Sequence, residues 1–290
     1  MSADPVTLKA SAIGELAVYS AVNALSAEKI LPESFRPVIL LPPGTEEEEL
    51  RRIMDRICLA CGREDLVVEG GHTEVTSAVT RPVVIGACTG TAMNAASDHP
   101  VRRARKGSGS GGDSLKPGQI IMTKWAAMES SCILAQDREE LGTVFPETIL
   151  MRMRRLGEYL SVRRDARICA EEGAEFLVDL SEGGVYAALW RLCVKARRGF
   201  RVNMADIPVL QETIELANHY DIDPYKIRSA GSLLAVTGDA EALIGRLKDN
   251  GIPAVRIGEL TDNNDKLLRN GDEIRYLDLP QPDELLKVIR

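Results

Sequence analysis

Hydrophobic residues recur along this chain with two periods, one typical of helices and one of strands. Between Ile13 and Ala27 the apolar positions are spaced three and four apart, which predicts a helix with a buried face. Short apolar runs such as Phe35–Leu41 have the length and composition of strands instead. Further helices are predicted at 50–61, 132–135, 147–172, 185–196, 210–219 and 240–250. Further strands are predicted at 66–68, 81–86, 119–124, 176–179, 200–202, 232–236 and 254–257.

Turn and cap signals complete this pattern. Thr45 followed by Glu48 predicts a capping box at the start of the helix that includes 50–61. Gly199 is predicted to end the 185–196 helix, and Asn270-Gly271 to turn a hairpin. Strands and helices alternate, with some strands in succession. The predicted fold class is therefore α/β, or α+β in layers.

Length and linker composition predict two domains. A chain of 290 residues exceeds the size at which single cores usually stop growing. The run Gly107–Gly112 has the composition of a flexible linker. We therefore expect an N-terminal domain at 1–113 and a C-terminal domain at 114–290. The same run would also suit a mobile loop within one domain, or an engineered replacement of a longer loop.

Charge and composition narrow the class of function. A net charge of −7 and 4% aromatic residues argue against a nucleic-acid binder. The basic clusters at 102–106 and 197–198 are short enough to be solvated faces. No apolar run is long enough for a membrane span, and the chain start lacks a signal-peptide layout. Cys58 and Cys61 form a Cys-x-x-Cys without a second pair, so reduced thiols and a cytoplasmic protein are expected.

Two glycine pairs carry the candidate chemistry. Gly70-Gly71 is followed by His72, Thr73 and Glu74, although a hairpin tip with a solvated glutamate would look the same. Gly183-Gly184 opens a predicted helix, so its free N–H groups would make an anion pocket. Asp179 ends the strand before it. A tight connection without a ligand remains the alternative for this second pair, and neither standard nucleotide fingerprint is present.

Nine strings in order resemble one known family. They are Asp4–Thr7, Leu41–Thr45, Gly70–Thr76, Arg81–Val84, Met122–Trp125, Asp179–Val185, Ile207–Val209, Gly231–Leu234 and Ile257–Thr261. Together they resemble the aminoimidazole ribonucleotide synthetase superfamily, and within it the hydrogenase maturation factor branch that makes thiocyanate from a carbamoyl thioester. The resemblance covers nearly the whole chain.

The resemblance implies a fold and a chemistry. It implies an N-terminal α/β domain that pairs across a homodimer, a C-terminal α/β domain, and ATP with magnesium in the cleft between them. The shared reaction activates an amide or thioamide oxygen of a small-molecule substrate with ATP. Related branches phosphorylate a small molecule. Magnesium needs oxygen ligands, and the transferred phosphoryl group needs nearby cations.

Site residues follow from the matched motifs. Asp4 corresponds to the family's strand-end magnesium ligand, and Glu74 to the acid near metal and phosphates, with His72 as its neighbour. Lys124 would contact phosphate, although a solvated strand end is the alternative. The remaining nucleotide-binding candidates are Asn23, Gly70, Gly71, Thr73, Glu129, Asp179, Gly183 and Gly184. Asp179 would otherwise cap the following helix.

The chain also departs from the family pattern. Only Met1–Ala3 precede the Asp-Pro motif, where the family has a glycine-rich segment with Gly-Glu-Asp-Ala-Ala. Ala24 replaces the aspartate of the Asn-Asp pair, and Ala127–Ser131 replaces Gly-Leu-Glu-Gly-Thr. The chain ends without the acceptor cysteine that thiocyanate formation requires. We therefore expect reduced magnesium and ATP affinity, a weakened dimer and no cyanation of its own tail.

Two hypotheses result. The leading hypothesis is a divergent, hydrogenase-maturation-factor-like protein that binds ATP and magnesium for phosphoryl transfer to, or dehydration of, a small amide-like substrate. The alternative is a catalytically degenerate member that acts as a scaffold or dimer partner, with a maturation protein as a possible partner. A truncated start of a longer gene product would also explain the missing segment.

Overall fold

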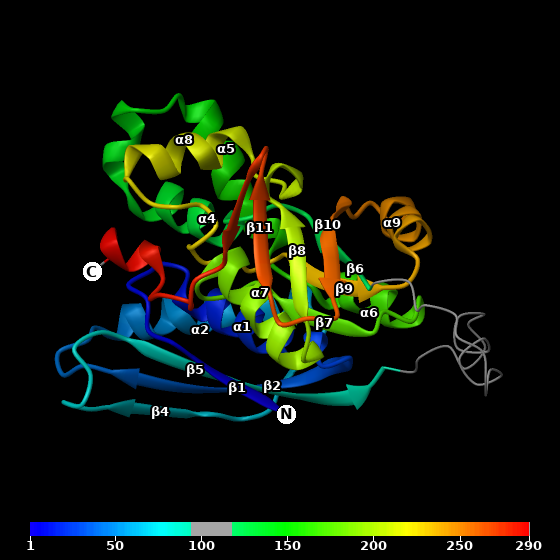
Figure 1. Ribbon diagram of the computed structural model, residues 1–290. Helices are drawn as coiled ribbons and strands as arrows, with labels where there is room; N and C mark the ends of the chain where they lie inside the picture. The colour runs from blue at the N-terminus through cyan, green and yellow to red at the C-terminus, as the bar shows by residue number, and fades with distance from the viewer. Residues whose placement is uncertain (94–117, 290) are drawn as a thin grey trace.

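The computed structural model describes residues 1–93 and 118–289, which form two sheets and eight α-helices (Figure 1). The linker run Gly107–Gly112, the basic cluster at 102–106 and the boundary expected at 113/114 lie outside the described residues. The division into two domains at that boundary therefore stays a prediction. The mixed α/β class predicted from the sequence is confirmed.

The first sheet has five strands. Its order is β1 (Ser2–Val6), β5 (Val83–Ala92), β2 (Ile30–Leu41) and then β3 (Val67–Val68), with β4 (His72–Val75) also on β2. Strands β1 and β2 run antiparallel to β5, whereas β3 and β4 run parallel to β2. Helices α1 (Ile13–Ala27) and α2 (Glu47–Arg63) lie on one face of this sheet (Figure 1).

The second sheet has seven strands. Its order is β12 (Glu273–Tyr276), β11 (Lys266–Asn270), β8 (Gly199–Asn203), β10 (Ala254–Thr261), β6 (Gln119–Thr123), β9 (Leu233–Thr237) and β7 (Phe176–Asp179). Helix α7 (Gly184–Ala196) packs on one face, and α6 (Arg163–Glu171) and α9 (Ala240–Asp249) pack on the other. Helices α4 (Met128–Asp137), α5 (Glu147–Arg155) and α8 (Gln211–His219) gather at one end of the sheet (Figure 1).

Helix α1 is the central element of the fold. Fourteen of its 15 residues are buried, because it contacts the first sheet and α2 on one side and α6 and β7 on the other. Gly86 of β5 permits this packing, since a Cβ there would lie 2.6 Å from the carbonyl oxygen of Ala17. Polar residues of α1 are therefore buried between the two sheets.

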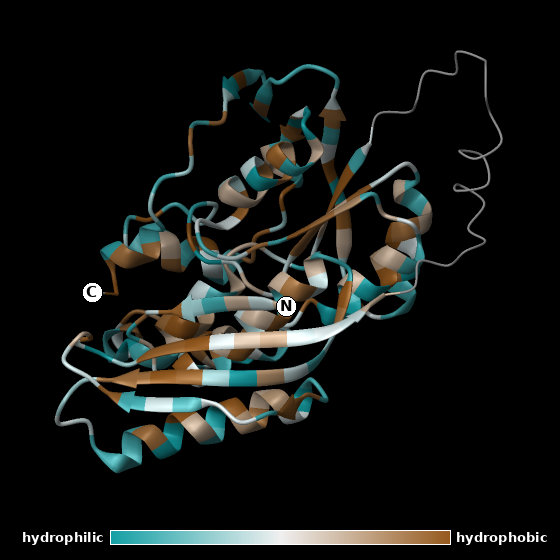
Figure 2. Cartoon of the chain, turned by 90° about the horizontal axis from the view of Figure 1, so that it is seen from below, coloured by the Kyte–Doolittle hydropathy of each residue, from teal (hydrophilic) through white to brown (hydrophobic). Residues whose placement is uncertain are grey.

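The opposite face of the first sheet carries no helix. Side chains alternate along β2 and β5: Ile39 and Val84 are buried under α1, whereas Val38, Leu40 and Ile85 point away from it and are partly exposed. Seen from below in Figure 2, the strands lie uncovered and carry long apolar stretches. This uncovered face is an apolar surface.

Several predicted elements are confirmed, and three details are wrong. The predicted helix Ile13–Ala27 and strand Phe176–Asp179 are confirmed at both ends, and β11 and β12 form the predicted hairpin. The helix predicted at 147–172 is interrupted, because α5 ends at Arg155 and a 3-10 turn, Leu156–Tyr159, precedes α6.

The other two errors concern helix ends. Thr45 does not cap α2, because its hydroxyl donates to the carbonyl oxygen of Pro42 and the helix starts only at Glu47. Gly199 does not end α7; Arg197 adopts the left-handed conformation there, with φ 55°. Gly199 instead begins β8.

Candidate functional site

The two sheets meet at a seam where β1 and β7 approach α1. Asp4 of β1 accepts a hydrogen bond from the hydroxyl of Ser20 on α1. Asp179 ends β7 on the other side of the seam. Arg191 of α7 donates to the carbonyl oxygen of Asp179 at 2.7 Å and to Ser181 Oγ at 3.2 Å. We call Asp4, Ser20, Asp179, Ser181 and Arg191 the seam site.

The Asp179 carboxylate is sensitive to its surroundings in the seam site. Burial is the largest cause that raises the pKa of Asp179; Arg191 opposes it, and the Asp4 carboxylate raises it further. A nearby second carboxylate disfavours ionisation, and a bound cation would relieve that repulsion. The Asp4 and Asp179 carboxylates therefore lie within electrostatic range of each other across the seam.

The second glycine pair forms a tight turn at the start of α7. Gly183 and Gly184 have φ of 74° and 61°, and a Cβ on Gly184 would lie 2.5 Å from the carbonyl oxygen of Ile227. Gly183 is the N-cap of α7, and no side chain caps this helix, so Asp179 is not its cap. The alternative reading of Asp179 is therefore wrong.

The sequence predicted free N–H groups in this turn, but the structure shows them hydrogen-bonded within the chain. Gly183 N–H donates to Asp283 Oδ2 at 2.7 Å, and Tyr186 N–H donates to the carbonyl oxygen of Tyr225 at 3.2 Å. Asp283 is buried, and burial raises its pKa to about 6. A carboxylate from the end of the chain therefore occupies the place expected for an anion.

Glu129 lies in the first turn of α4. Arg228 donates to Glu129 Oε1 at 3.0 Å, and Ala230 N–H donates to Oε2 at 3.1 Å. Glu129 and Arg228 are both buried. Removing one partner of such a pair leaves an uncompensated buried charge, so Glu129 has a structural task.

Asn23 and Lys124 both hold the segment between α5 and α6. The side chain of Asn23 donates to Leu160 O at 2.7 Å and accepts from Val162 N–H at 2.9 Å. Lys124 Nζ donates to Ser161 O at 2.8 Å and to Asp165 at 3.1 Å. Lys124 is 6% exposed, so the alternative of a solvated strand end is wrong.

The first glycine pair lies at an edge of the first sheet. Gly70 and Gly71 join β3 to β4, and both strands pair with β2 in the same direction, so the segment is a continued edge and not a hairpin tip. A Cβ on Gly71 would lie 2.5 Å from the carbonyl oxygen of Pro37. His72 and Glu74 are exposed on β4, with 3.6 Å between Nε2 and Oε2, and Thr73 lies between them.

The predicted site residues thus fall into three groups. Asp4, Asp179, Gly183 and Gly184 lie at or beside the seam. Asn23, Lys124 and Glu129 are buried in internal contacts. Gly70–Glu74 lie at an edge that β2 and β5 separate from β1, so one chain does not bring Glu74 to Asp4.

Three residues near the seam were missed from the sequence. Arg228 lies just before the Gly231–Leu234 string that contributed to the resemblance. The string drew attention to this segment, but nothing in it predicted a role for Arg228. Arg191 lies two helical turns after Gly184, and that spacing was a usable signal. Asp283 lies 100 positions from Gly183 in the sequence, and no local pattern predicts their contact.

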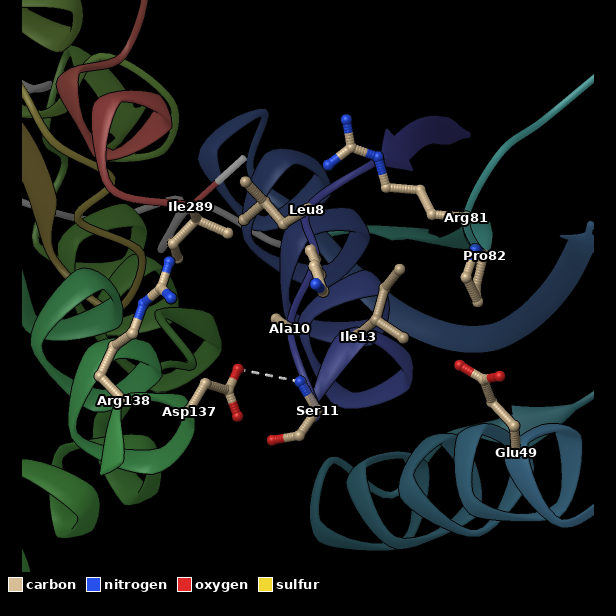
Figure 3. Close-up of a pocket in the computed structure, with 11 residues that line it drawn as sticks. Leu8, Ala10, Ser11, Ile13, Glu49, Arg81, Pro82, Asp137, Arg138 and Ile289 are labelled. Atoms are coloured by element: carbon tan, nitrogen blue, oxygen red, sulfur yellow. Dashed lines mark hydrogen bonds between the residues drawn. The ribbon is translucent and has the colours of Figure 1, made fainter. Parts of the chain in front are cut away.

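A separate cavity of about 310 Å³ lies beside the start of α1 (Figure 3). Ser11 N–H donates to Asp137 Oδ2 at 3.0 Å there, and Arg81 and Arg138 line its walls (Figure 3). None of the predicted site residues lines this cavity. Over residues 1–93 and 118–289, no three His, Cys, Asp or Glu side chains cluster as a ready-made metal site.

Comparison with known proteins agrees with the fold. Residues 126–269 match the model of the AIR synthase related protein C-terminal domain. Carbamoyl dehydratase HypE of Rhodobacter capsulatus is 24% identical over 238 residues, 82% of this chain and 65% of that protein. The alignment thus spans just under two thirds of that relative. In the described parts of the chain, no helix is both long and apolar enough to cross a membrane.

Solved structures of HypE share the fold. The Escherichia coli HypE crystal structure has a TM-score of 0.76 at 17% identity, covering 98% of this chain and 87% of its own. A HypE–HypF complex gives 0.75 at 19% identity, covering 96% and 90%. HypE in complex with ATP gives 0.72 at 17% identity, covering 98% and 86%. Residues 126–269 therefore match the AIR synthase related family, and the chain as a whole resembles HypE in sequence and fold.

Proposed function

We propose that the seam site binds ATP with Mg²⁺ for phosphoryl transfer to, or dehydration of, a small amide-like substrate. The observation that carries this proposal is that Asp4 and Asp179, one from each sheet, lie close enough for the Asp4 charge to raise the pKa of Asp179. A HypE of the same fold has been crystallised with ATP. When bound, the nucleotide would supply an activated phosphoryl group.

The residues of the seam fit Mg²⁺ only together with a nucleotide. Asp4 and Asp179 are hard oxygen donors, which Mg²⁺ prefers. Two carboxylates without a third acidic or imidazole ligand, as in the described residues, do not make an all-protein cage. Mg²⁺ is commonly held by one or two carboxylates plus phosphate oxygens and water. Asp4 and Asp179 would hold it in this way.

A paired substitution tests this assignment. Asp179→Asn keeps the shape of the side chain but removes its charge, so ATP should bind roughly tenfold or more weakly when Mg²⁺ is present. The matched control is Asp249→Asn, the same change at an exposed position of α9, which should leave ATP affinity unchanged. Equal affinity in both variants would refute the seam as the nucleotide site.

The alternative function is that of a catalytically degenerate scaffold. It is favoured by Asn23, Lys124 and Glu129, whose polar groups are already engaged by the chain itself, and by the occupied N–H of Gly183. A folded protein that binds no ATP under any magnesium concentration would support this alternative.

Partners are also proposed. The uncovered apolar face of the first sheet supports a homodimer, because a patch of this kind on a soluble chain is commonly an interface. In such a dimer, Glu74 and His72 would reach a nucleotide only in the neighbouring subunit. The HypE–HypF complex supports a maturation protein as a further partner. The cytoplasmic location expected from the sequence stays a prediction.

A further inference from the structure

A larger cavity, of about 580 Å³, lies apart from the seam site. It forms where the start of β2, the end of α2, the segment between α5 and α6, and the loop before β10 meet. Its volume lies within the range of roughly 300–1,000 Å³ that is typical of small-molecule sites. Its lining includes five basic and four acidic side chains. Such a lining suits a ligand that is both charged and rich in hydrogen bonds.

One wall of the cavity holds a buried ion pair. The side chains of Lys124 and Asp165 are 6% and 3% exposed. Lys124 Nζ lies 3.1 Å from each oxygen of Asp165, but only the contact to Oδ2 has hydrogen-bond geometry. Asp165 Oδ1 has no hydrogen-bond partner among the described residues. This oxygen is closed off from solvent, so the Lys124 ammonium compensates its charge and a ligand in the cavity does not reach it.

A hydrogen-bond acceptor lies beside this pair. Ser161 donates to Glu64 Oε2 at 2.8 Å, and among the described residues Glu64 Oε1 has no hydrogen-bond donor; both residues line the cavity. Burial raises the pKa of Glu64 above its ordinary value, so the group is poorly solvated. Glu64 is therefore the acceptor that this wall offers to a ligand.

Basic side chains line the cavity at the start of α6. Arg163, Arg164 and Arg167 line the cavity from one helix, and Arg63 lines it from α2. Arg63 is bound by Glu15 at 2.8 Å, whereas Arg163 has no carboxylate within 4.0 Å in the described part of the chain. The positive end of the α6 dipole lies at these same residues. This wall favours an anion, and guanidinium groups match phosphate oxygens in geometry.

We propose that this cavity binds a small phosphorylated metabolite that also carries hydroxyl or amine donors. Arg163 and Arg164 would bind the phosphate at the start of α6, and Glu64 would accept a hydrogen bond from a hydroxyl or amine donor. The cavity would then be a second ligand site, separate from the seam site.

The test uses glucose 6-phosphate, inorganic phosphate and glucose as probes in calorimetric titrations of the full chain. Glucose 6-phosphate offers both a phosphate and hydroxyl donors, so it should bind most tightly; glucose alone should not bind. Arg163→Gln should weaken glucose 6-phosphate by roughly tenfold or more, since a charge-assisted hydrogen bond is lost. Glu64→Gln should reduce the preference for glucose 6-phosphate over inorganic phosphate.

Two controls locate the site. Arg52→Gln removes an exposed arginine of α2 that does not line the cavity, and it should leave the affinity unchanged. Asp179→Asn at the seam should also leave it unchanged, which separates this proposal from the nucleotide site. The proposal is overturned if no phosphorylated probe binds saturably, if Arg163→Gln binds like the unmodified chain, or if inorganic phosphate binds as tightly as glucose 6-phosphate.

Discussion

At the scale of single residues, the amino-acid type predicts the backbone conformation better than it predicts the contacts of the side chain. The glycines at 70–71 and 183–184 were expected to turn the chain, and they adopt the positive φ values that such turns require. The partners of Lys124, Glu129 and Asn23 were not foreseen, because they come from distant parts of the chain. A charged residue in a motif looks the same in sequence whether it contacts a ligand or a buried partner.

Asp283 gives a prediction for stability against pH. Its pKa rises from an ordinary value of 3.8 to about 6 on folding, so it favours the folded state fully below pH 3.8 and this contribution is lost as the pH rises through 6. Lowering the pH from 7 to 4 should therefore stabilise the unmodified chain relative to Asp283→Asn by roughly 3 kcal/mol.

Denaturant unfolding of both proteins between pH 4 and 7 measures this difference. Asp249→Asn, the same change at an exposed position of α9, serves as the control. A constant difference for Asp283→Asn would mean that the Asp283 carboxylate is not desolvated against Gly183.

At the scale of elements, strong hydrophobic periodicity predicted the position of a helix reliably, whereas local cap signals did not predict where helices end. The spacing within Ile13–Ala27 predicted both ends of α1, because a long apolar pattern has only one helical register. The predicted helix at 147–172 failed because its break depends on Asn23 and Lys124, which hold the backbone of 159–162 in a non-helical path. Tertiary hydrogen bonds overrode local propensity there.

Asn23→Ala tests this interpretation of the break. The substitution leaves the carbonyl oxygen of Leu160 and the N–H of Val162 buried without their partner, which should cost roughly 2–4 kcal/mol of unfolding free energy. Asn218→Ala, at an exposed position of α8, should cost less than about 0.5 kcal/mol. Chemical denaturation measures both losses of unfolding free energy. Equally small losses would show that the Asn23 hydrogen bonds contribute little to stability.

At the scale of the whole molecule, ordered motifs identified the family more surely than any physical pattern. The strand order of the two sheets could not be read from strand positions, because β7 and β9, paired at one edge of the second sheet, are 54 positions apart at their closest paired residues. The resemblance implied an N-terminal and a C-terminal α/β domain, but no strand order. It did not supply the separation of Glu74 from Asp4, which depends on how strands are ordered in the first sheet.

The uncovered face of the first sheet gives a prediction for assembly. Ile85→Glu places a charge in the centre of this face and should convert a dimer to a monomer, whereas Ile214→Glu on α8 should not. Size-exclusion chromatography with light scattering distinguishes the two masses. A mass unaffected by Ile85→Glu would place any dimer interface elsewhere.

The central claim is that Asp4 and Asp179 form a magnesium-dependent nucleotide site. Calorimetric titration of the unmodified chain with ATP, with Mg²⁺ and then with excess chelator, tests it most directly. The account predicts saturable binding of one ATP per chain that weakens by roughly tenfold or more when Mg²⁺ is removed. No binding, or binding of equal strength without Mg²⁺, would contradict it.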